Sequence, residues 1–372
     1  MKTVCGDADP ILPVLLALFL LSTPANAEAQ LYGSLRSGVE YVHIHGAGSP
    51  VSTQFRVADQ TSRIGAQGSD PLGDGWAAIW RVENRLHIGD PNKSAGNDLW
   101  GSRNTYVGLQ SPFGSLKAGQ DDDAYKTSTG TLTPAFDDTF NASTDPFGNG
   151  ELIRRLGQLD NSIIGFRSTL LYGLGLNLSI GHIGKQGGNY NPLSLAATAY
   201  YQGERFRIGG GWKTLNDTSS RLSSKLTLKD DGSANNPGDK LSAFDFGMNY
   251  SCLNWSSSIY YERTATHYAG AQADQDDMAA ALVYKKDRWA IYASYIRMLD
   301  VQGDVSAGAG PGTGASQYNL AGYYVVAPKT RLVVSIVKLE NGAHASFNQS
   351  SGVNVKAGQS FWIFTTGLRA DF

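Results

Sequence analysis

The residues best suited to charge-based chemistry are concentrated in one long segment, from Asp121 to Gln158. It holds seven carboxylates among aromatic, glycine, proline and small polar residues. A connection longer than ~15 residues without a repeating pattern is uncommon, and it is usually functional or disordered. The segment also carries Phe136, Phe140 and Phe147, which a merely solvated loop does not need. We therefore expect it to fold inward and pack against the strands around it, the alternative being a mobile surface insertion.

Carboxylates can also serve enzymes or metal sites, but the spacing favours neither. None of the six histidines has the spacing of a catalytic triad or a zinc site. His43 and His45 share a strand face and could bind a metal, although exposed polar residues are the simpler interpretation. A divalent cation among Asp230, Asp231 and Asp239 is conceivable without a supporting pattern. The chain lacks a nucleophile elbow and a phosphate-binding glycine motif. We expect no catalytic residue, no metal, no cofactor and no enzyme activity.

The N-terminus has the pattern of an export signal. An apolar run from Ile11 to Leu21 is followed by the small-residue site Ala25-Asn26-Ala27. A run of ~11 residues suits a signal peptide and is shorter than the ~20 residues of a spanning helix. We expect residues 1–27 to be a cleaved signal peptide and residues 28–372 to form a single domain, the alternative being an N-terminal membrane anchor.

Composition narrows the class of protein. Near-equal numbers of basic (31) and acidic (33) residues argue against a nucleic-acid partner. Charged residues make up 17% of the chain, below the ~25% of soluble domains, and glycines number 44. Cleavage of the signal leaves Cys252 as the single cysteine, which cannot form an internal disulfide. These features fit a soluble β-sandwich, a secreted adhesin or an outer-membrane barrel.

The strand pattern decides among these classes. Residues 31–42 alternate between apolar and polar with period two, as a strand with two different faces does. Similar segments follow, joined alternately by tight turns and by long loops. We expect the long loops near residues 46–60, 89–101, 121–158, 184–192, 216–240, 268–277, 302–316 and 342–359. About sixteen strands with one short-turn rim and one long-loop rim predict an antiparallel transmembrane β-barrel.

The last strand predicts how the barrel closes. Residues 361–372 alternate like the first strand and end at Phe372 with no tail. Because an open strand edge promotes aggregation, this strand needs a partner. Pairing it with residues 31–42 closes the barrel, whereas a terminal strand of a sandwich remains the alternative.

At this point the sequence resembles a known family, the trimeric general porins of Gram-negative outer membranes, especially the beta-proteobacterial and neisserial type. The residues that carry the resemblance span essentially the whole mature chain: Leu31-Tyr32-Gly33, Ser62-Arg63-Ile64-Gly65, Ala78-Ile79-Trp80-Arg81-Val82-Glu83, Tyr106-Val107-Gly108-Leu109, Phe113-Gly114-Ser115-Leu116-Lys117-Ala118-Gly119, Asp160-Asn161-Ser162-Ile163 and Phe372. The resemblance implies a sixteen-stranded barrel whose third long loop, residues 121–158, folds into the lumen and narrows the pore.

The same resemblance implies function and partners. We expect a homotrimer that lets small hydrophilic solutes and ions diffuse passively across the outer membrane. It would contact outer-membrane lipid and lipopolysaccharide, and the barrel-assembly machinery would recognise its C-terminal strand through Phe372. The alternatives are a channel selective for organic acids or sugars, and a barrel that is an adhesin or an enzyme.

Strand parity assigns residues to the pore wall. Because side chains alternate along a strand, the residues opposite the lipid-facing ones face the lumen. The basic wall is then Arg36, Arg63, Arg81, Arg85, Arg103 and Lys117, and the family supports Arg63 and Arg103 in particular. Facing it, the acidic loop offers Asp121, Asp122, Asp137, Asp138, Asp145 and Glu151. Opposed rows of charge create a transverse field that sorts solutes by charge and dipole.

One feature of the loop departs from the family, and one set of its acids has an alternative role. The family places an arginine shortly before Asn161-Ser162, where this chain has Gln158-Leu159-Asp160, so that Arg154 or Arg155 is the candidate substitute. The acids at residues 121–123 could instead pin the turn, which leaves Asp137 and Asp138 as the better pore candidates.

Overall fold

The protein consists almost entirely of strands. The computed structural model describes residues 28–46, 52–89, 100–127, 152–157, 159–182, 192–217, 238–348, 353 and 355–372. The strands are β1 (Glu28–Gly46), β2 (Ser52–Asp59), β3 (Arg63–Gly73), β4 (Trp76–Arg85), β5 (Thr105–Ser111), β6 (Gly114–Asp122), β7 (Leu159–Ser168), β8 (Leu174–His182), β9 (Leu193–Gln202), β10 (Phe206–Asn216), β11 (Lys240–Cys252), β12 (Trp255–Tyr268), β13 (Ala271–Lys286), β14 (Trp289–Met298), β15 (Gln302–Gly303), β16 (Ala315–Ala327), β17 (Thr330–Asn341) and β18 (Gln359–Asp371). A 3-10 helix, η1 (Val305–Ala307), and a helical turn at residues 124–127 complete the described elements. None of the described helical residues belongs to a helix that could cross a membrane.

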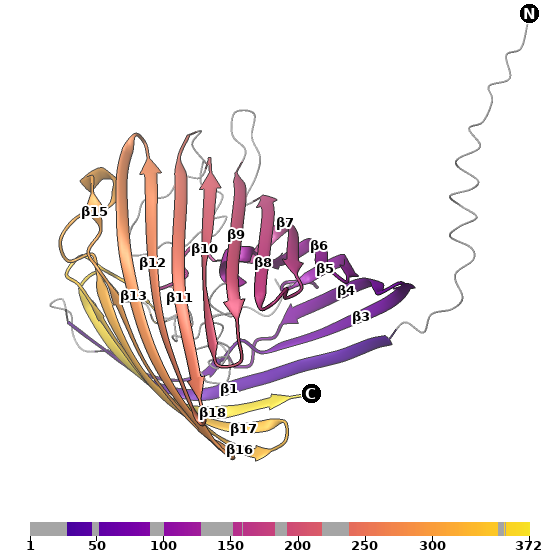
Figure 1. Cartoon of the computed structure of the whole chain (residues 1–372). Helices are drawn as coiled ribbons and strands as arrows, with labels where there is room; N and C mark the ends of the chain where they lie inside the picture. Colours follow the sequence, from indigo (N-terminus) through magenta and orange to yellow (C-terminus); the bar gives the residue numbers. More distant parts are fainter. Residues whose placement is uncertain are drawn as a thin grey trace, which may run out of the picture.

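The strands form one closed antiparallel sheet, in which each wall strand pairs with its neighbours along the chain (Figure 1). β2 and β3 both pair with β1 and act as one bent strand. β15 has only two residues and pairs with β13 beside the longer β14. Counting β2 and β3 as one strand and setting β15 aside leaves sixteen wall strands. The predicted sixteen-stranded antiparallel barrel is therefore confirmed.

The two ends of the chain close the barrel. β18 pairs with β1 over a register that runs from Ser34 opposite Asp371 to Gly46 opposite Gln359. At the end of the chain, Gly33 and Phe372 exchange both backbone hydrogen bonds, at 3.1 and 3.0 Å. This pairing removes the free edge of the sheet, as we predicted from the last strand.

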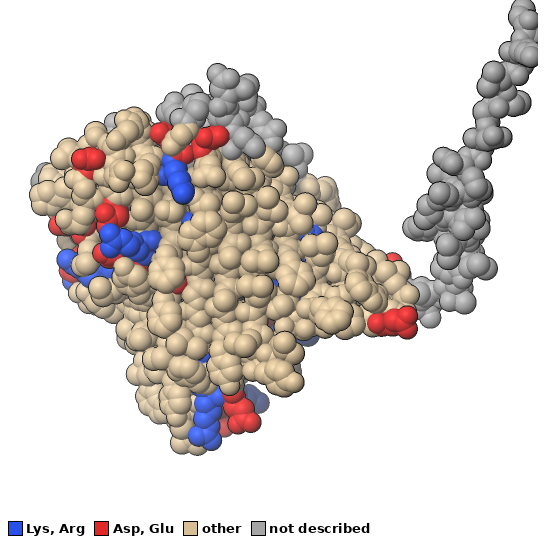
Figure 2. All heavy atoms as spheres, turned by 45° about the horizontal axis from the view of Figure 1, so that its top comes forward, with Lys and Arg blue, Asp and Glu red and all other residues tan. Residues whose placement is uncertain are grey.

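The wall is apolar outside and polar inside. On β8 the outward side chains Leu176 and Ile180 are 40% and 46% exposed, whereas the inward Asn177 and Ser179 are 3% and 9% exposed. In water such exposed apolar side chains would be unfavourable, whereas in a bilayer they face lipid. Figure 2 shows charged residues gathered in patches toward the ends of the molecule, with a broad uncharged surface between them. The outer face is thus suited to a membrane.

Two of the long loops that we predicted are largely strand. Within residues 46–60 the structure has β2, which pairs with β1 from Ser37 opposite Asp59 to Ile44 opposite Ser52. Within residues 268–277 it has a two-residue turn, because Ala269 and Gly270 both adopt positive φ angles of 49° and 82°. Such a turn matches the twist of a hairpin, so β12 and β13 continue to its edge. The region near 302–316 also contains β15 and η1.

Candidate functional site

Three of the predicted wall arginines meet at one cavity on the inner face of the barrel. The cavity has a volume of about 330 Å³. It is lined by Tyr32, Gly33, Ser34, Arg63, Arg81, Glu83, Arg103, Asn104, Asp122 and Asp371. The arginines come from β3, β4 and the residues just before β5, whose pairing brings them side by side. Charged groups of both signs therefore border one space inside the barrel.

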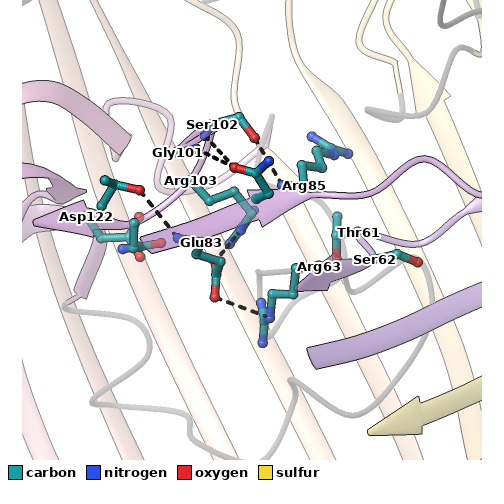
Figure 3. A network of polar contacts seen from close by, with 12 residues as sticks. Thr61, Ser62, Arg63, Glu83, Arg85, Gly101, Ser102, Arg103 and Asp122 are labelled. Atoms are coloured by element: carbon teal, nitrogen blue, oxygen red, sulfur yellow. Dashed lines mark hydrogen bonds and ion pairs between the residues drawn. The ribbon is translucent and has the colours of Figure 1, made fainter. Parts of the chain in front are cut away.

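Glu83 connects two of these arginines, Arg63 and Arg103 (Figure 3). Its Oε1 accepts a hydrogen bond from Arg103 Nε at 2.6 Å, and its Oε2 lies 3.9 Å from Arg63 Nε. The Tyr32 hydroxyl donates to the same Oε2 at 2.9 Å. Strand parity places Glu83 on the inward face, but parity alone does not reveal that it binds Arg103. The carboxylate fixes the guanidinium of Arg103 and partly offsets its charge.

Arg81 is held by aromatic rings. Its guanidinium carbon lies 5.6 Å from the ring centroid of Tyr32 and 5.8 Å from that of Tyr106. Its Nη2 donates to Gln67 Oε1 at 2.6 Å. Such cation–π contacts contribute about 0.5–2 kcal/mol each, more when shielded from water. Arg81 is thus fixed against the wall while it keeps its full charge.

The backbone around the cluster aims Arg63 and Arg103. Thr61 adopts a positive φ of 65° at the bend between β2 and β3, and the Ser62 hydroxyl accepts from the Arg36 N–H at 2.9 Å. On the next strand, Asn84 Oδ1 accepts from the N–H groups of Gly101 and Ser102 (Figure 3). These contacts tie the residues before β5 to the end of β4, and so direct Arg103 toward Glu83.

The acids at residues 121–123 are engaged in local contacts. Asp121 accepts from Lys117 Nζ at 3.0 Å and from Asn104 Nδ2 at 2.5 Å, and it lies within β6 rather than in the loop. Asp122 pairs with Lys126 at 2.5 Å while lining the cavity. The structural role that we considered for these residues is therefore observed, and Asp122 combines it with a place at the cavity.

Asp123 belongs to a fully buried ion pair. Lys213 Nζ lies 2.6 Å from Asp123 Oδ2 and 3.9 Å from Asp160 Oδ1, and all three side chains have almost no exposure. Asp123 Oδ1 also accepts from the Lys126 N–H at 2.7 Å, which begins the helical turn. This ion pair fixes the start of the 121–158 segment to β10.

The other end of that segment is fixed to β12. Glu262 accepts from the Arg154 N–H at 2.6 Å, from the Arg155 N–H at 3.2 Å and from the Tyr125 hydroxyl at 2.5 Å. One carboxylate on the barrel wall thus receives donors from both described ends of the segment. The Arg155 side chain binds Gln275 and lies 5.4 Å from the ring of Phe347. Arg154 and Arg155 are buried, and neither lines the cavity.

An apolar cluster supports this anchor. Leu152 and Ile153 are fully buried and pack with Phe347 and with the wall residues Val42 and Ile44. Val42 and Ile44 are apolar although they face the otherwise polar interior of the barrel. They belong to the same buried cluster as Leu152 and Ile153 at the end of the 121–158 segment. The described ends of the 121–158 segment therefore contact the inner wall, while its course between them lies outside the described residues.

The predicted site residues thus fall into three groups. Arg63, Arg81, Arg103 and Asp122 line the cavity. Arg36, Arg85, Lys117 and Asp121 occupy the neighbouring wall, with Arg36 Nε on Ser34, the Arg85 N–H on Ser102 and Lys117 Nζ on Asp121. The remaining acids, Asp137, Asp138, Asp145 and Glu151, lie outside the described residues. Asp371, which we did not predict as a site residue, also lines the cavity. Within the part of the chain that the structure describes, no group of three or more acidic, histidine or cysteine side chains is placed to hold a metal ion.

A closed barrel with an apolar exterior, a polar interior and a charged internal cavity defines a membrane-spanning β-barrel of the outer-membrane class. The family model described as Gram-negative porin matches residues 14–344. The chain belongs to the Gram-negative porin family, and its location is the outer membrane.

Relatives in sequence agree with this family. The major outer membrane protein P.IB of Neisseria meningitidis serogroup B / serotype 15 (strain H44/76) is 30% identical over 209 residues, which cover 54% of this chain and 58% of that protein. The protein of the same name from Neisseria gonorrhoeae is 35% identical over 111 residues, 28% of this chain and 30% of that protein. The match thus spans little more than half the length of the first relative.

Among solved structures, an anion-selective porin from Comamonas acidovorans superimposes with a TM-score of 0.71 at 15% identity, covering 93% of this chain and 100% of that one. The trimer form of OmpT from Vibrio cholerae gives a TM-score of 0.68 at 17% identity, with 93% and 99% covered. These likenesses concern the fold.

Proposed function

We propose that the protein forms a water-filled channel for the passive diffusion of small hydrophilic solutes and ions across the outer membrane. The observation that carries this proposal is the charged cavity around Arg63, Arg81 and Arg103 on the polar inner wall of a closed barrel. A pore must stay wet to conduct, and charged side chains on its wall favour water there. No covalent step is needed, and we propose no enzyme activity.

We further propose that residues 121–158 form the constriction. Two observations support it: both described ends of this segment bind Glu262 on the inner wall, and Leu152 and Ile153 are buried there. Asp137 and Asp138 would then face the arginines. Replacing both with Asn should shift the reversal potential toward anions, and an unchanged value would place them outside the ion path.

The assembly and its processing are also proposals. The trimer form of the OmpT structure supports a homotrimer for this chain. We propose that residues 1–27 are removed on export, that lipid and lipopolysaccharide cover the outer wall, and that the barrel-assembly machinery binds the strand ending at Phe372. Cross-linking of intact cells should give a ladder ending at three subunits, whereas a single band at one subunit would contradict the trimer.

A liposome swelling assay tests the channel itself. Vesicles that contain the folded protein should swell in isotonic solutions of small sugars, and the rate should fall steeply as the sugars grow. Swelling equal to that of protein-free vesicles would contradict a diffusion channel. A rate that saturates for one sugar or organic acid and is blocked by it would instead favour a solute-selective channel.

A further inference from the structure

Five basic residues recur at the short-turn ends of the wall strands. Arg167 on β7, Arg207 on β10, Lys285 on β13 and Arg331 on β17 are each the second residue from that end, and Arg369 on β18 is the third. We call these residues the turn-side basic ring. They come from five strands between β7 and β18, so this part of the inner wall is lined by positive charge at its short-turn edge.

The side chains of the ring point into the lumen. Lys285 Nζ lies 5.7 Å from the ring centroid of Tyr292, which is almost completely buried on the inner face. The guanidinium carbon of Arg331 lies 5.1 Å from the ring of Tyr323, whereas the neighbouring Leu332 points outward and is 48% exposed. The same alternation places Arg167, Arg207 and Arg369 inward. On their strands Ile164, Trp212 and Leu368 point outward, 54%, 44% and 44% exposed, and each lies an odd number of residues away.

Little negative charge opposes the ring. Among the described side chains in the last three positions of each strand at this edge, the inward face carries one acid, Asp371. Arg369 Nε holds both of its carboxylate oxygens at 3.0 Å. The turns beyond the strands carry both signs, with Glu204 and Asp287 beside Arg205 and Arg288. The inner edge therefore keeps a net positive charge.

The register adds an unfavourable arrangement of like charges. Arg369 lies directly opposite Arg331 on one side and directly opposite Arg36 on the other. Like charges directly opposite each other on neighbouring strands are destabilising. A wall that served stability alone would gain from polar, uncharged side chains here. The arrangement points to a role for the charge.

We propose that the turn-side basic ring is an anion site at the periplasmic mouth, which recruits multivalent phosphate-bearing solutes into the channel. The short-turn rim of an outer-membrane barrel faces the periplasm. Guanidinium groups bind phosphate oxygens in pairs, and several cations around one opening favour an anion with several charges. A cleft lined by one sign of charge raises the local concentration of counter-ions. This proposal rests on the channel function above.

Apart from Arg369, whose partner Asp371 lines the central cavity, the ring is separate from the central arginine cluster. Arg63, Arg81 and Arg103 come from the β3–β5 region, where Glu83 and Asp122 balance part of their charge. The ring spans β7 to β18 at the edge of the wall. Two positive regions in series, one of them at a single mouth, make the pore electrically asymmetric. A multivalent anion should therefore block it more strongly from one side than from the other.

Inorganic tripolyphosphate is the probe for this asymmetry in single channels in a planar bilayer. In 0.15 M KCl the half-blocking concentration should differ about tenfold between the two sides. In 1 M KCl most of the difference should vanish, because the screening length falls from about 8 Å to about 3 Å. The variant R167Q/R207Q/K285Q/R331Q should lose the difference while it still conducts. Arg369 is kept because it pairs with Asp371.

Arg263→Gln is the matched control. Arg263 lies on the outer face, 51% exposed and paired with Asp274 and Asp276. Removing its positive charge should leave the half-blocking concentrations unaltered. If the fourfold variant does not fold, R207Q/R331Q should raise the lower half-blocking concentration about threefold. Equal block from both sides in the unmodified protein, or undiminished asymmetry in these variants, would overturn the ring proposal alone. A protein that never conducts would overturn the channel function instead.

Discussion

Arg103 donates its Nε–H to Glu83 Oε1 at 2.6 Å, which places a carboxylate among the arginines of the inner wall. Arg63 approaches the other oxygen of Glu83, at 3.9 Å. Glu83 thus positions the guanidinium of Arg103 and lowers the net positive charge of the cavity. The charge balance of the cavity depends on Glu83 as well as on Asp122 and Asp371.

Replacing Glu83 with Gln should therefore make the channel prefer anions more strongly. Gln keeps the shape but removes one negative charge a few ångströms from the ion path, where a unit charge contributes about 1–4 kcal/mol. Even about 1 kcal/mol changes a ratio about fivefold. The reversal potential in a KCl gradient measures this ratio. Glu340→Gln, on the outer face of β17, is the matched control and should leave it unchanged.

Replacing Gly33 with Ala should weaken the closure of the barrel. A Cβ atom on Gly33 would lie 2.3 Å from the Phe372 ring, so the ring must move. Overpacking in a core costs about 1–3 kcal/mol, and because the Phe372 side chain is 46% exposed and can turn aside, the loss here should lie at the lower end. Unfolding in denaturant should show a lower free energy of unfolding for Gly33→Ala. In a protein that already carries Phe372→Ala, the same change at Gly33 should cost much less. Gly165→Ala, whose Cβ would meet only a carbonyl oxygen at 4.0 Å, should be nearly neutral. Equal losses at Gly33 and Gly165 would contradict the contact.

Replacing Lys213 with Met should strongly destabilise the fold. The change leaves the buried Asp123 without the cation at 2.6 Å, and breaking a buried pair costs about 3–5 kcal/mol. The double variant K213M/D123N should recover part of this loss, because the charge of Asp123 is gone while that of Asp160 remains. The midpoint of urea unfolding measures both changes. The exposed Lys240, replaced with Met, is the control, and an effect there as large as at Lys213 would contradict the role of burial.

The Tyr125 hydroxyl should make stability depend on alkaline pH. Burial first, and then the nearby charge of Glu262, raises the pKa of Tyr125 well above its usual value of 10.0. A group whose pKa is raised on folding stabilises fully below its unfolded pKa, and it loses that contribution as pH rises toward the folded pKa. The stability difference between the unmodified protein and Tyr125→Phe should thus be constant at neutral pH and shrink above about pH 10. A difference that stays constant to pH 12 would contradict this account.

Alternation of side chains predicted much of the barrel and little of its internal contacts. Period two placed Arg63, Arg81 and Arg103 on the inner face, because a strand has only two faces. It did not reveal the bond between Arg103 and Glu83, which depends on side-chain rotamers and on the bend at Thr61.

The misassigned loops and the apolar inner residues have physical explanations. The turn at Ala269-Gly270 lacks the Asn-Gly or Asp-Gly that usually signals a hairpin, so it was predicted as part of a loop. Val42 and Ile44 face inward, against the polar pattern, because Leu152 and Ile153 cover them. Only contacts between residues distant in the chain determine that arrangement.

Single-channel recording in a planar bilayer tests the central claim most directly. Protein that is verified as folded, by its heat-dependent migration in a gel, should produce discrete conductance steps that scale with salt concentration. Trimers should add conductance in units of three equal channels. A bilayer that stays silent with the folded protein present would contradict the proposal that this barrel is an open diffusion channel.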